Sequence, residues 1–224
     1  MEIKQKLSKN FSSRQGSKII AIVDHITAGS FSGAVSWLRN QASKASAHYV
    51  ISRAGEIVQL VADENSAWHS GGLNKPNWPL YDGVNPNRYT IGIEHEGYKD
   101  QGGNGDLTEE QYQATLWLHK QLISKHGIPV DRDHIIGHYR IDSVNRPNCP
   151  GPAFPWDRLF ADLQTVPGPF HDVSGDRWSA GHIQWCKENG WLKGYDDGTF
   201  RPEAPMTREQ MAVILARLRD KGVI

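Results

Sequence analysis

The sequence predicts an α/β domain with a mixed central β-sheet flanked by helices, followed by a linker and a small helical module. Strand-like and helix-like patterns are mixed along the chain as far as Leu163. The stretch "QTVPGPF" that follows is short and rich in Pro and Gly, as linkers are. Beyond it, two helical patterns bracket a turn-rich middle. We therefore expect domains at 1–163 and 170–224, joined by a linker at 164–169.

The composition argues against several classes of function. The 224 residues include 25 Lys and Arg and 25 Asp and Glu, so the formal charge is zero. Because no long basic stripe is present, nothing favours nucleic acid as a partner. The N-terminal "MEIKQKLSKNFSSRQGSK" lacks the apolar core of a signal peptide, and no apolar run approaches the roughly 18 residues of a membrane span. We expect synthesis in the cytoplasm without membrane insertion.

The first elements of the α/β domain are strands, a helix and a long loop. Ile19 to Val23 form a nearly continuous apolar run, typical of a buried strand, which ends at His25. "GAVSWLRNQASK" predicts a helix at 33–44. "SAHYVISRAGEIVQLV" predicts two strands around a turn at Ala54 and Gly55. "AWHSGGLNKPNWPLYDGVNPNR" is rich in Gly, Pro and Asn and predicts a long, ordered loop.

The next elements are an alternating strand and the clearest helix. In "YTIGIEHEGY" the side chains alternate between the two faces of a strand. One face takes Ile91, Ile93 and His95, and the other takes Gly92, Glu94 and Glu96. In "LTEEQYQATLWLHKQLISKHGIP", Thr108 and Gln111 fit a capping box and Gly127 ends the helix. We expect His119 and His126 to pack on its apolar side.

The C-terminal module contains two predicted helices. The first starts near Ser179 and ends at Gly190, with Cys186 on its apolar side and therefore in the expected core. The second is capped by Thr207, with Gln210 at the capping-box position. Helical spacing predicts that the second helix buries Met211, Ile214, Leu215 and Leu218.

Three residues suggest a metal site. His25 lies at the end of a buried strand, His138 follows the apolar "IIG", and Cys149 precedes a Pro-Gly pair. Two imidazoles and a thiolate suit Zn²⁺ and leave a fourth position for water. Strand-end histidines and an inert buried thiol are the alternatives, as is a cysteine peptidase that uses Cys149 and His138. A disulfide between Cys149 and Cys186 is not expected, because they fall in different predicted domains without a secretory signal.

The segment from about Lys18 to Leu159 resembles the zinc-dependent N-acetylmuramoyl-L-alanine amidases of the type-2 family, relatives of peptidoglycan recognition proteins. The matching stretches are "IVDHITAG", "SAHYVISRAGEIVQLV", "AWHSG", "TIGIEHEG" and "GHYRIDSVNRPNCPGPAFPW". This resemblance implies that family's fold and zinc ligation by His25, His138 and Cys149. It also implies hydrolysis of the amide between N-acetylmuramic acid and L-alanine in peptidoglycan.

The same resemblance implies catalytic roles. Glu94 matches the family's catalytic glutamate, and Glu96 shares its strand face, so it is an alternative base. Several relatives place a lysine two residues before the last zinc ligand to stabilise the oxyanion. This chain has Pro147 there. Arg146 is one residue earlier and is the candidate replacement, with a surface role as the alternative.

Two further residues are candidates for contact with the substrate. Tyr49 falls where some relatives carry an active-site tyrosine, with ordinary aromatic packing as the alternative. His69, in "AWHSGG", is a candidate to hydrogen-bond the substrate or the oxyanion, with a loop-positioning role as the alternative.

The C-terminal module resembles an S-layer homology module through "FHDV", a Trp before the first helix, "GYDDGTFRP" and "MTREQMAVIL". The resemblance implies binding to secondary cell-wall polysaccharide, for which Trp178 and Arg208 are the candidate residues. Such modules commonly occur in threes, so self-association would multiply the contacts of this single one. The two domains together resemble a phage or prophage endolysin. A bacterial autolysin and a non-catalytic peptidoglycan-binding protein are the alternatives.

Overall fold

The computed structural model describes residues 1–97, 104–164, 168–175 and 177–222. The chain divides into two compact units, Met1–Leu163 and Gln164–Ile224, and each is described by itself. Residues 165–167 of the predicted linker, and positions 176, 223 and 224 of the predicted module, lie outside the described residues. Within the described part of the chain, no helix combines the length and apolar character needed to cross a membrane.

A six-stranded sheet forms the centre of unit 1, in the order β1-β5-β4-β7-β3-β8. Neighbouring strands are parallel except for the antiparallel pair β4 and β5. A separate antiparallel pair joins β2 to β6. The strands are β1 (Ile3–Gln5), β2 (Phe11–Ser13), β3 (Ala21–Ile26), β4 (Tyr49–Ile51), β5 (Ile57–Gln59), β6 (Asn65–Ala67), β7 (Thr90–His95) and β8 (Ile135–Gly137).

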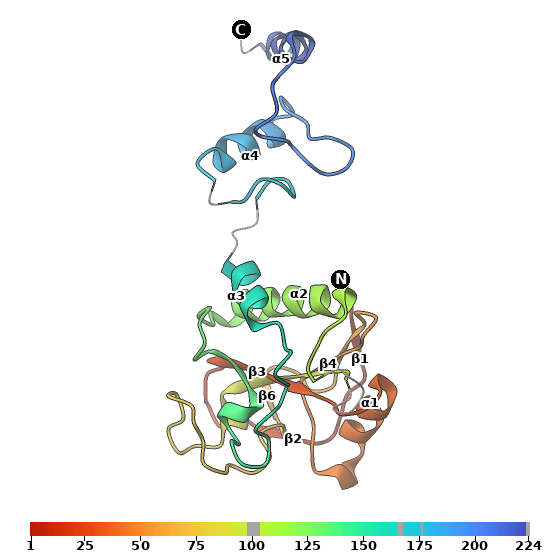
Figure 1. Cartoon of the computed structure of the whole chain (residues 1–224), viewed down its shortest axis with the longest axis vertical. Coiled ribbons are helices and arrows are strands. Elements are labelled where there is room, and N and C mark those ends of the chain that lie inside the picture. The colour runs from red at the N-terminus through yellow and green to blue at the C-terminus, as the bar shows by residue number, and fades with distance from the viewer. Residues whose placement is uncertain (98–103, 165–167, 176, 223–224) are drawn as a thin grey trace. The chain divides into compact units, whose positions relative to one another are not determined.

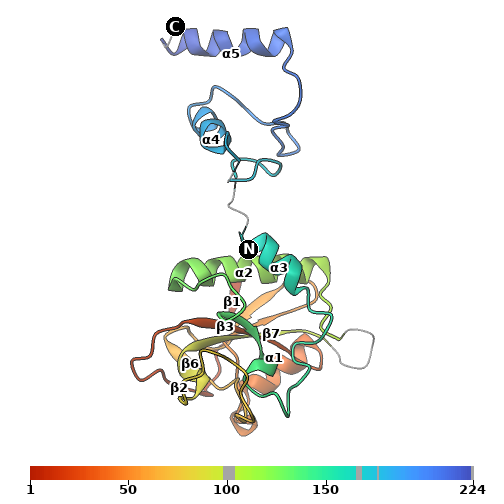
Figure 2. The same cartoon turned by 60° about the vertical axis from the view of Figure 1, so that its left-hand side comes forward.

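Helices cover both faces of this sheet (Figures 1 and 2). On one face lie α2 (Glu109–His126) and α3 (Trp156–Gln164), and on the other lies α1 (Phe31–Arg39). Leu118 of α2 packs with Ile91 and Ile93 of β7, whereas Leu38 of α1 packs with Val50 of β4. This arrangement confirms the predicted mixed sheet flanked by helices. Both faces of the sheet carry apolar side chains, and each face is buried by packing against helices.

Local boundaries differ from the sequence prediction in two ways. The helix expected at 33–44 begins at Phe31, where the Ser30 side chain caps it, and ends at Arg39. The Asn40 side chain then accepts from the backbone N–H of Ala42 and starts a separate 3₁₀ turn, η1 (Gln41–Ser43). Strands β1, β2, β6 and β8 and helix α3 were not predicted as elements. The three residues of β1, β2 and β6 are mostly polar (IKQ, FSS and NSA), so no apolar pattern marks them as strands.

Unit 2 contains α4 (Ala180–Glu188) and α5 (Arg208–Asp220). Its buried apolar residues, Val173, Ala180 and Ile183, come from α4 and the segment before it. The expectation that α5 buries four apolar side chains is wrong: none of its residues is buried, and Met211 and Leu215 are 43% and 47% exposed. The buried apolar cluster of unit 2 includes no residue of α5, and Ile214 and Leu218 are only half-buried. Cys186 is half-buried rather than in the core.

Candidate active site

The register of the sheet brings together side chains that are far apart in the sequence. In the parallel pair β3 and β7, His25 lies opposite Glu94, so both point to the face away from α2. In the pair β3 and β8, Asp24 lies opposite Gly137. His138 follows Gly137 directly and begins the 3₁₀ turn η3 (His138–Arg140), which places its ring beside that of His25.

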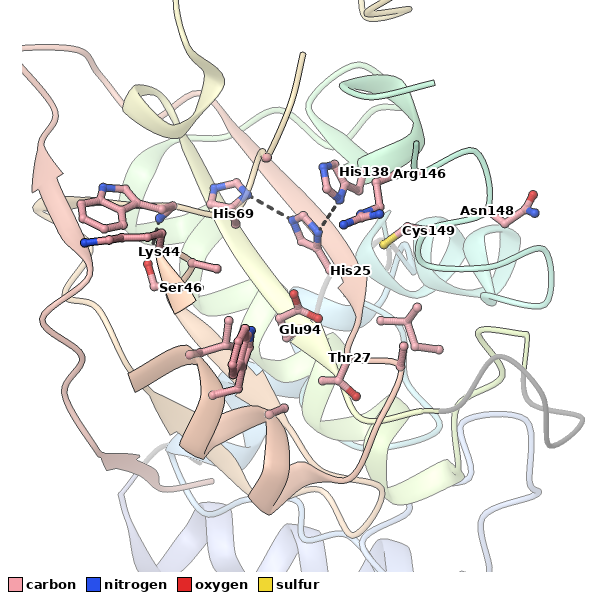
Figure 3. Close-up of a pocket in the computed structure, with 18 of the residues that line it drawn as sticks. His25, Thr27, Lys44, Ser46, His69, Glu94, His138, Arg146, Asn148 and Cys149 are labelled. Carbon is pink, nitrogen blue, oxygen red and sulfur yellow. Dashed lines mark hydrogen bonds between the residues drawn. The ribbon is translucent and has the colours of Figure 1, made fainter. Parts of the chain in front are cut away.

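Cys149 returns to the site through the loop after η3. The Asp142 carboxylate accepts hydrogen bonds from the backbone N–H groups of Val144 and Asn145 and fixes the start of this loop. The backbone N–H of Tyr139 donates to Cys149 O at 3.1 Å and fixes its end. One potential ligand atom each from His25, His138 and Cys149 lies within 4.8 Å of the others, and all three residues are buried (Figure 3).

The two histidines face each other through the same ring atom, because His25 Nδ1 lies 3.0 Å from His138 Nδ1. The environment of His138 Nε2 shows which of the two ring nitrogens carries the hydrogen. His138 Nε2 lies 2.8 Å from Ser70 O, and a carbonyl oxygen only accepts. His138 Nε2 therefore carries the hydrogen, and in a neutral ring its Nδ1 carries a lone pair.

A longer chain of hydrogen bonds fixes His25. The Thr90 hydroxyl donates to Pro86 O at 2.7 Å, so Thr90 Oγ1 accepts from His69 Nε2 at 3.1 Å. His69 Nδ1 is then an acceptor, and His25 Nε2–H donates to it at 3.1 Å. His25 Nδ1 consequently carries a lone pair, as His138 Nδ1 does.

The donor set fits a zinc ion. Burial lowers the pKa of His25 and His138, and a charge on His138 would lower that of His25 further, so both rings are neutral near pH 7. Two lone pairs 3.0 Å apart repel unless a cation lies between them. In tetrahedral sites with bonds of 2.0–2.1 Å, ligand nitrogens lie about 3.3 Å apart. The nearby thiol of Cys149 completes a set of nitrogen and sulfur donors that Zn²⁺ prefers.

Glu94 enters the same pocket from β7 (Figure 3). Its Oε2 is buried and has no hydrogen-bond partner among the described residues. Burial raises the pKa of Glu94 to about 7, while the nearby positive charge of Arg146 acts in the opposite direction. A carboxyl group that titrates near neutral pH is suited both to remove and to return a proton.

Glu96 has a different environment, which decides between the two candidate bases. Its Oε1 accepts from the backbone N–H of Phe31 and its Oε2 from that of Arg53, both at 2.8 Å. The carboxylate thus joins the start of α1 to the turn after β4. Because both of its oxygens accept backbone hydrogen bonds, Glu96 is a structural residue and Glu94 is the candidate base.

The prediction of an active-site role for Tyr49 is wrong. Tyr49 lies opposite Ile93 in the register of β4 and β7, so it points to the α2 face, away from Glu94. Its hydroxyl donates to Asp63 Oδ1 at 2.6 Å and accepts from the Gln59 amide at 3.0 Å. Alternation along β4 is the physical reason, and the packing alternative holds.

The structure also corrects the expectation for His69. Both of its ring nitrogens are engaged, one by His25 and the other by Thr90, so neither is available to a substrate or an oxyanion. Arg146, in contrast, is exposed and lines the pocket. Its positive charge opposes the burial that raises the pKa of Glu94 and adds to the burial that lowers the pKa of His138. Its role as the oxyanion stabiliser stays a prediction.

A cavity of about 460 Å³ surrounds these groups. Beside the predicted residues, its wall includes side chains that sequence reasoning missed: Trp37, Lys44, Ser46 and Trp68. One signal was available in the sequence, because Trp37 falls outside the apolar side of the helix that Val35 and Leu38 form, and the structure leaves it 58% exposed. Aromatic rings beside polar groups form a surface on which sugar rings and peptide groups can pack.

In unit 2, the two predicted wall-polymer residues, Trp178 and Arg208, are exposed, and Trp178 is 85% accessible. Neither lines the cavity of about 490 Å³ that α5 forms with the segment before it. That cavity contains Tyr195 and Arg201, whose guanidinium lies 4.0 Å from the centre of the Tyr195 ring. Binding of the polymer by Trp178 and Arg208 stays a prediction.

Comparisons with known proteins agree with this geometry. N-acetylmuramoyl-L-alanine amidase A of Achromobacter lyticus is 28% identical over 170 residues, 68% of this chain and 87% of that protein. The 1,6-anhydro-N-acetylmuramyl-L-alanine amidase AmpD of Salmonella typhimurium is 38% identical over 119 residues, 53% of this chain and 57% of that protein. The crystal structure of a selenomethionine derivative of AmpD has a TM-score of 0.59 at 27% identity, covering 72% of this chain and 94% of the other.

Two family profiles match separate parts of the chain. Residues 169–212 match the S-layer homology domain. Residues 15–152 match the N-acetylmuramoyl-L-alanine amidase family, and this segment includes His25, Glu94, His138 and Cys149. The chain therefore belongs to the N-acetylmuramoyl-L-alanine amidase family and carries an S-layer homology domain in addition.

Proposed function

We propose that this amidase is zinc-dependent and cleaves the amide between N-acetylmuramic acid and the L-alanine of the peptidoglycan stem. The observation that carries the proposal is the convergence of two Nδ1 lone pairs, from His25 and His138, next to the Cys149 thiol. The same observation disfavours a cysteine peptidase, because His138 Nδ1 faces another imidazole and its Nε2 is bound to Ser70 O.

We assign a separate role in the hydrolysis to each group of residues in the site. His25, His138 and Cys149 would hold the zinc ion, which when bound would acidify water and polarise the carbonyl. Glu94 accepts a proton from the attacking water and returns it to the amine of L-alanine as the C–N bond breaks. Burial, which raises the pKa of Glu94 to about 7 in the metal-free chain, favours a carboxyl group that can both accept and return a proton. Arg146, at the edge of the cavity, supplies positive charge for the oxyanion.

The S-layer homology unit serves the same target. We propose that it holds the enzyme on secondary cell-wall polysaccharide through Trp178 and Arg208, and that the whole chain is a wall-lytic enzyme of the phage or prophage endolysin type. The combination of an amidase and a wall-binding domain supports this role. Self-association through this unit stays a prediction, which the exposed apolar side chains of α5 support.

Digestion of purified cell walls tests the function. The zinc-loaded chain should release new N-terminal alanine, and a chelator or Glu94→Gln should abolish the release. A thiol alkylator added after zinc loading should have little effect, whereas a cysteine peptidase would show the reverse pattern. New reducing sugar ends would contradict the proposal, and no new ends at all would indicate a binding protein. Walls stripped of polysaccharide should retain less of the chain.

A further inference from the structure

We propose that Asn87 and Thr90 act as positioning residues that fix both ligand histidines, through the adjacent residues His69 and Ser70. The inference rests on the zinc site proposed above and adds its outer shell. Groups that hydrogen-bond to the nitrogen of a ligand histidine that does not face the metal set the tautomer and the ring orientation. Here the partners of both ligands come from one two-residue segment.

Asn87 holds this segment by a single oxygen. Asn87 Oδ1 accepts from the backbone N–H of His69 at 3.0 Å, and from the backbone N–H and the hydroxyl of Ser70, both at 2.8 Å. Asn87 is itself fixed in the 3₁₀ turn η2 (Pro86–Arg88). Its backbone N–H donates to the Asn85 side chain, and its carbonyl accepts from the Ser66 hydroxyl.

His69 and Ser70 each contact one ligand. Ser70 O accepts from His138 Nε2–H at 2.8 Å, and His69 Nδ1 accepts from His25 Nε2–H at 3.1 Å. A displacement of the segment would therefore disturb both ligand rings at once. Asn87 thus supports two ligands at once, although within the described part of the chain its side-chain oxygen bonds to His69 and Ser70 and to neither ligand ring.

The ring of His69 is confined by the strand beneath it. A Cβ atom at position 92 would lie 2.4 Å from His69 Cγ, so only Gly92 lets the ring lie against β7. Thr90 lies two residues earlier on the same face of β7, and its Oγ1 accepts a hydrogen bond from His69 Nε2 at 3.1 Å. The position of the His69 ring is therefore fixed by β7, the strand that also carries Glu94.

Thr90 sets the direction of the hydrogen-bond chain. Its only hydroxyl hydrogen is donated to Pro86 O, so its oxygen must accept from His69 Nε2–H. If this acceptor were lost, the proton of His69 could move to Nδ1. His69 would then donate to His25 Nε2, and the proton of His25 would move to Nδ1, the atom that faces His138.

The first test measures zinc affinity of the full chain by competition with a chromophoric chelator. Asn87→Ala should weaken binding about 10- to 100-fold, and Asn87→Asp, which keeps the acceptor oxygen, should restore most of it. The matched control is Asn10→Ala, which also removes three hydrogen bonds of a buried asparagine, but these bonds join Asn10 to Asn40, Ser43 and Ala45 rather than to His69, Ser70 or a ligand. It should lower the melting temperature and leave zinc affinity unchanged.

The second test uses Thr90→Val, which keeps the shape and removes the hydroxyl, and reads ¹⁵N shifts of the histidine rings in the metal-free chain. Wild type should show the Nε2–H tautomer for His25 and His138, and the variant should show Nδ1–H at His25. Unchanged tautomers together with unchanged zinc affinity in both variants would overturn the inference. Failure of the wild type to bind zinc would instead overturn the proposed function, while the tautomer measurement would still decide the outer shell.

Discussion

Helices α2 in unit 1 and α5 in unit 2 begin with the same local pattern, a threonine followed three residues later by a glutamine. In α5, Thr207 accepts from the backbone N–H of Gln210, and the Gln210 side chain accepts from that of Thr207, which closes a capping box. In α2, Thr108 accepts from Gln111 in the same way. The Gln111 side chain, however, donates to two backbone carbonyls elsewhere in unit 1.

The two helices also differ in how much they bury. Helix α2 buries Tyr112, Leu118 and Leu122 among others, whereas α5 buries none of its residues. Both sequences place apolar residues at helical spacing. The difference teaches that a cap is a local property, satisfied by atoms three residues away, whereas burial requires a second surface that the helix itself does not provide.

Truncation of one leucine in each helix is the strongest way to test this contrast. Leu118→Ala should lower the free energy of unfolding of unit 1 by about 2–5 kcal/mol, because the side chain is 1% exposed and leaves a cavity. Leu215→Ala, at 47% exposure, should cost less than about 1 kcal/mol in unit 2. Chemical denaturation followed by hydrogen exchange of each unit measures both. Equal costs would show that α5 is covered in solution.

Within unit 1, Glu94 and Glu96 offer a second pair of matching residues with opposite environments. Glu94→Gln should stabilise the metal-free protein at pH 8 by at most about 3 kcal/mol, because burial penalises the charged carboxylate. The gain should shrink as the pH falls from about 7 towards the ordinary value of 4.5, since Glu94 then becomes neutral in the folded state. Denaturation at several pH values measures it.

The control for that experiment is Glu96→Gln. Its amide NH₂ would face one of the two backbone N–H donors that now bind the carboxylate. We expect a loss of about 1–2 kcal/mol. A loss of stability in both variants would mean that the Glu94 carboxylate has partners in solution, and would weaken its assignment as the base.

The smallest effect concerns the two glutamines themselves. Gln111→Ala should cost about 1–2 kcal/mol, because the part-buried Glu96 carbonyl loses this donor and the buried Ile51 carbonyl keeps only the backbone N–H of Glu96. Gln210→Ala should cost about 0.5 kcal/mol, since the exposed backbone N–H of Thr207 can bond to water instead. Thermal unfolding of the full chain compares them. Equal losses of stability would show that the Gln111 and Gln210 side chains contribute equally to stability despite their different partners.

Much of the candidate site could be predicted from the sequence. His25, His138 and Cys149 were recognisable because each follows or closes a distinctive local segment, and Glu94 because strand alternation and family resemblance agree. Tyr49 was misplaced because its face depends on the register between β4 and β7, which no local pattern specifies. Asn87 and Thr90 gave no signal, because their importance lies in contacts with a segment about 20 residues away.

The sequence by itself determined the two-part organisation, both ends of α2, the cap that begins α5, and the types of side chain available for chemistry. These depend on composition, caps and periodicity, which act over a few residues. Only the tertiary structure decided which glutamate is unpartnered, which ring nitrogens face each other, and which helix is buried. Those outcomes depend on sheet register and on long-range hydrogen bonds, which exist only once distant segments have been brought together.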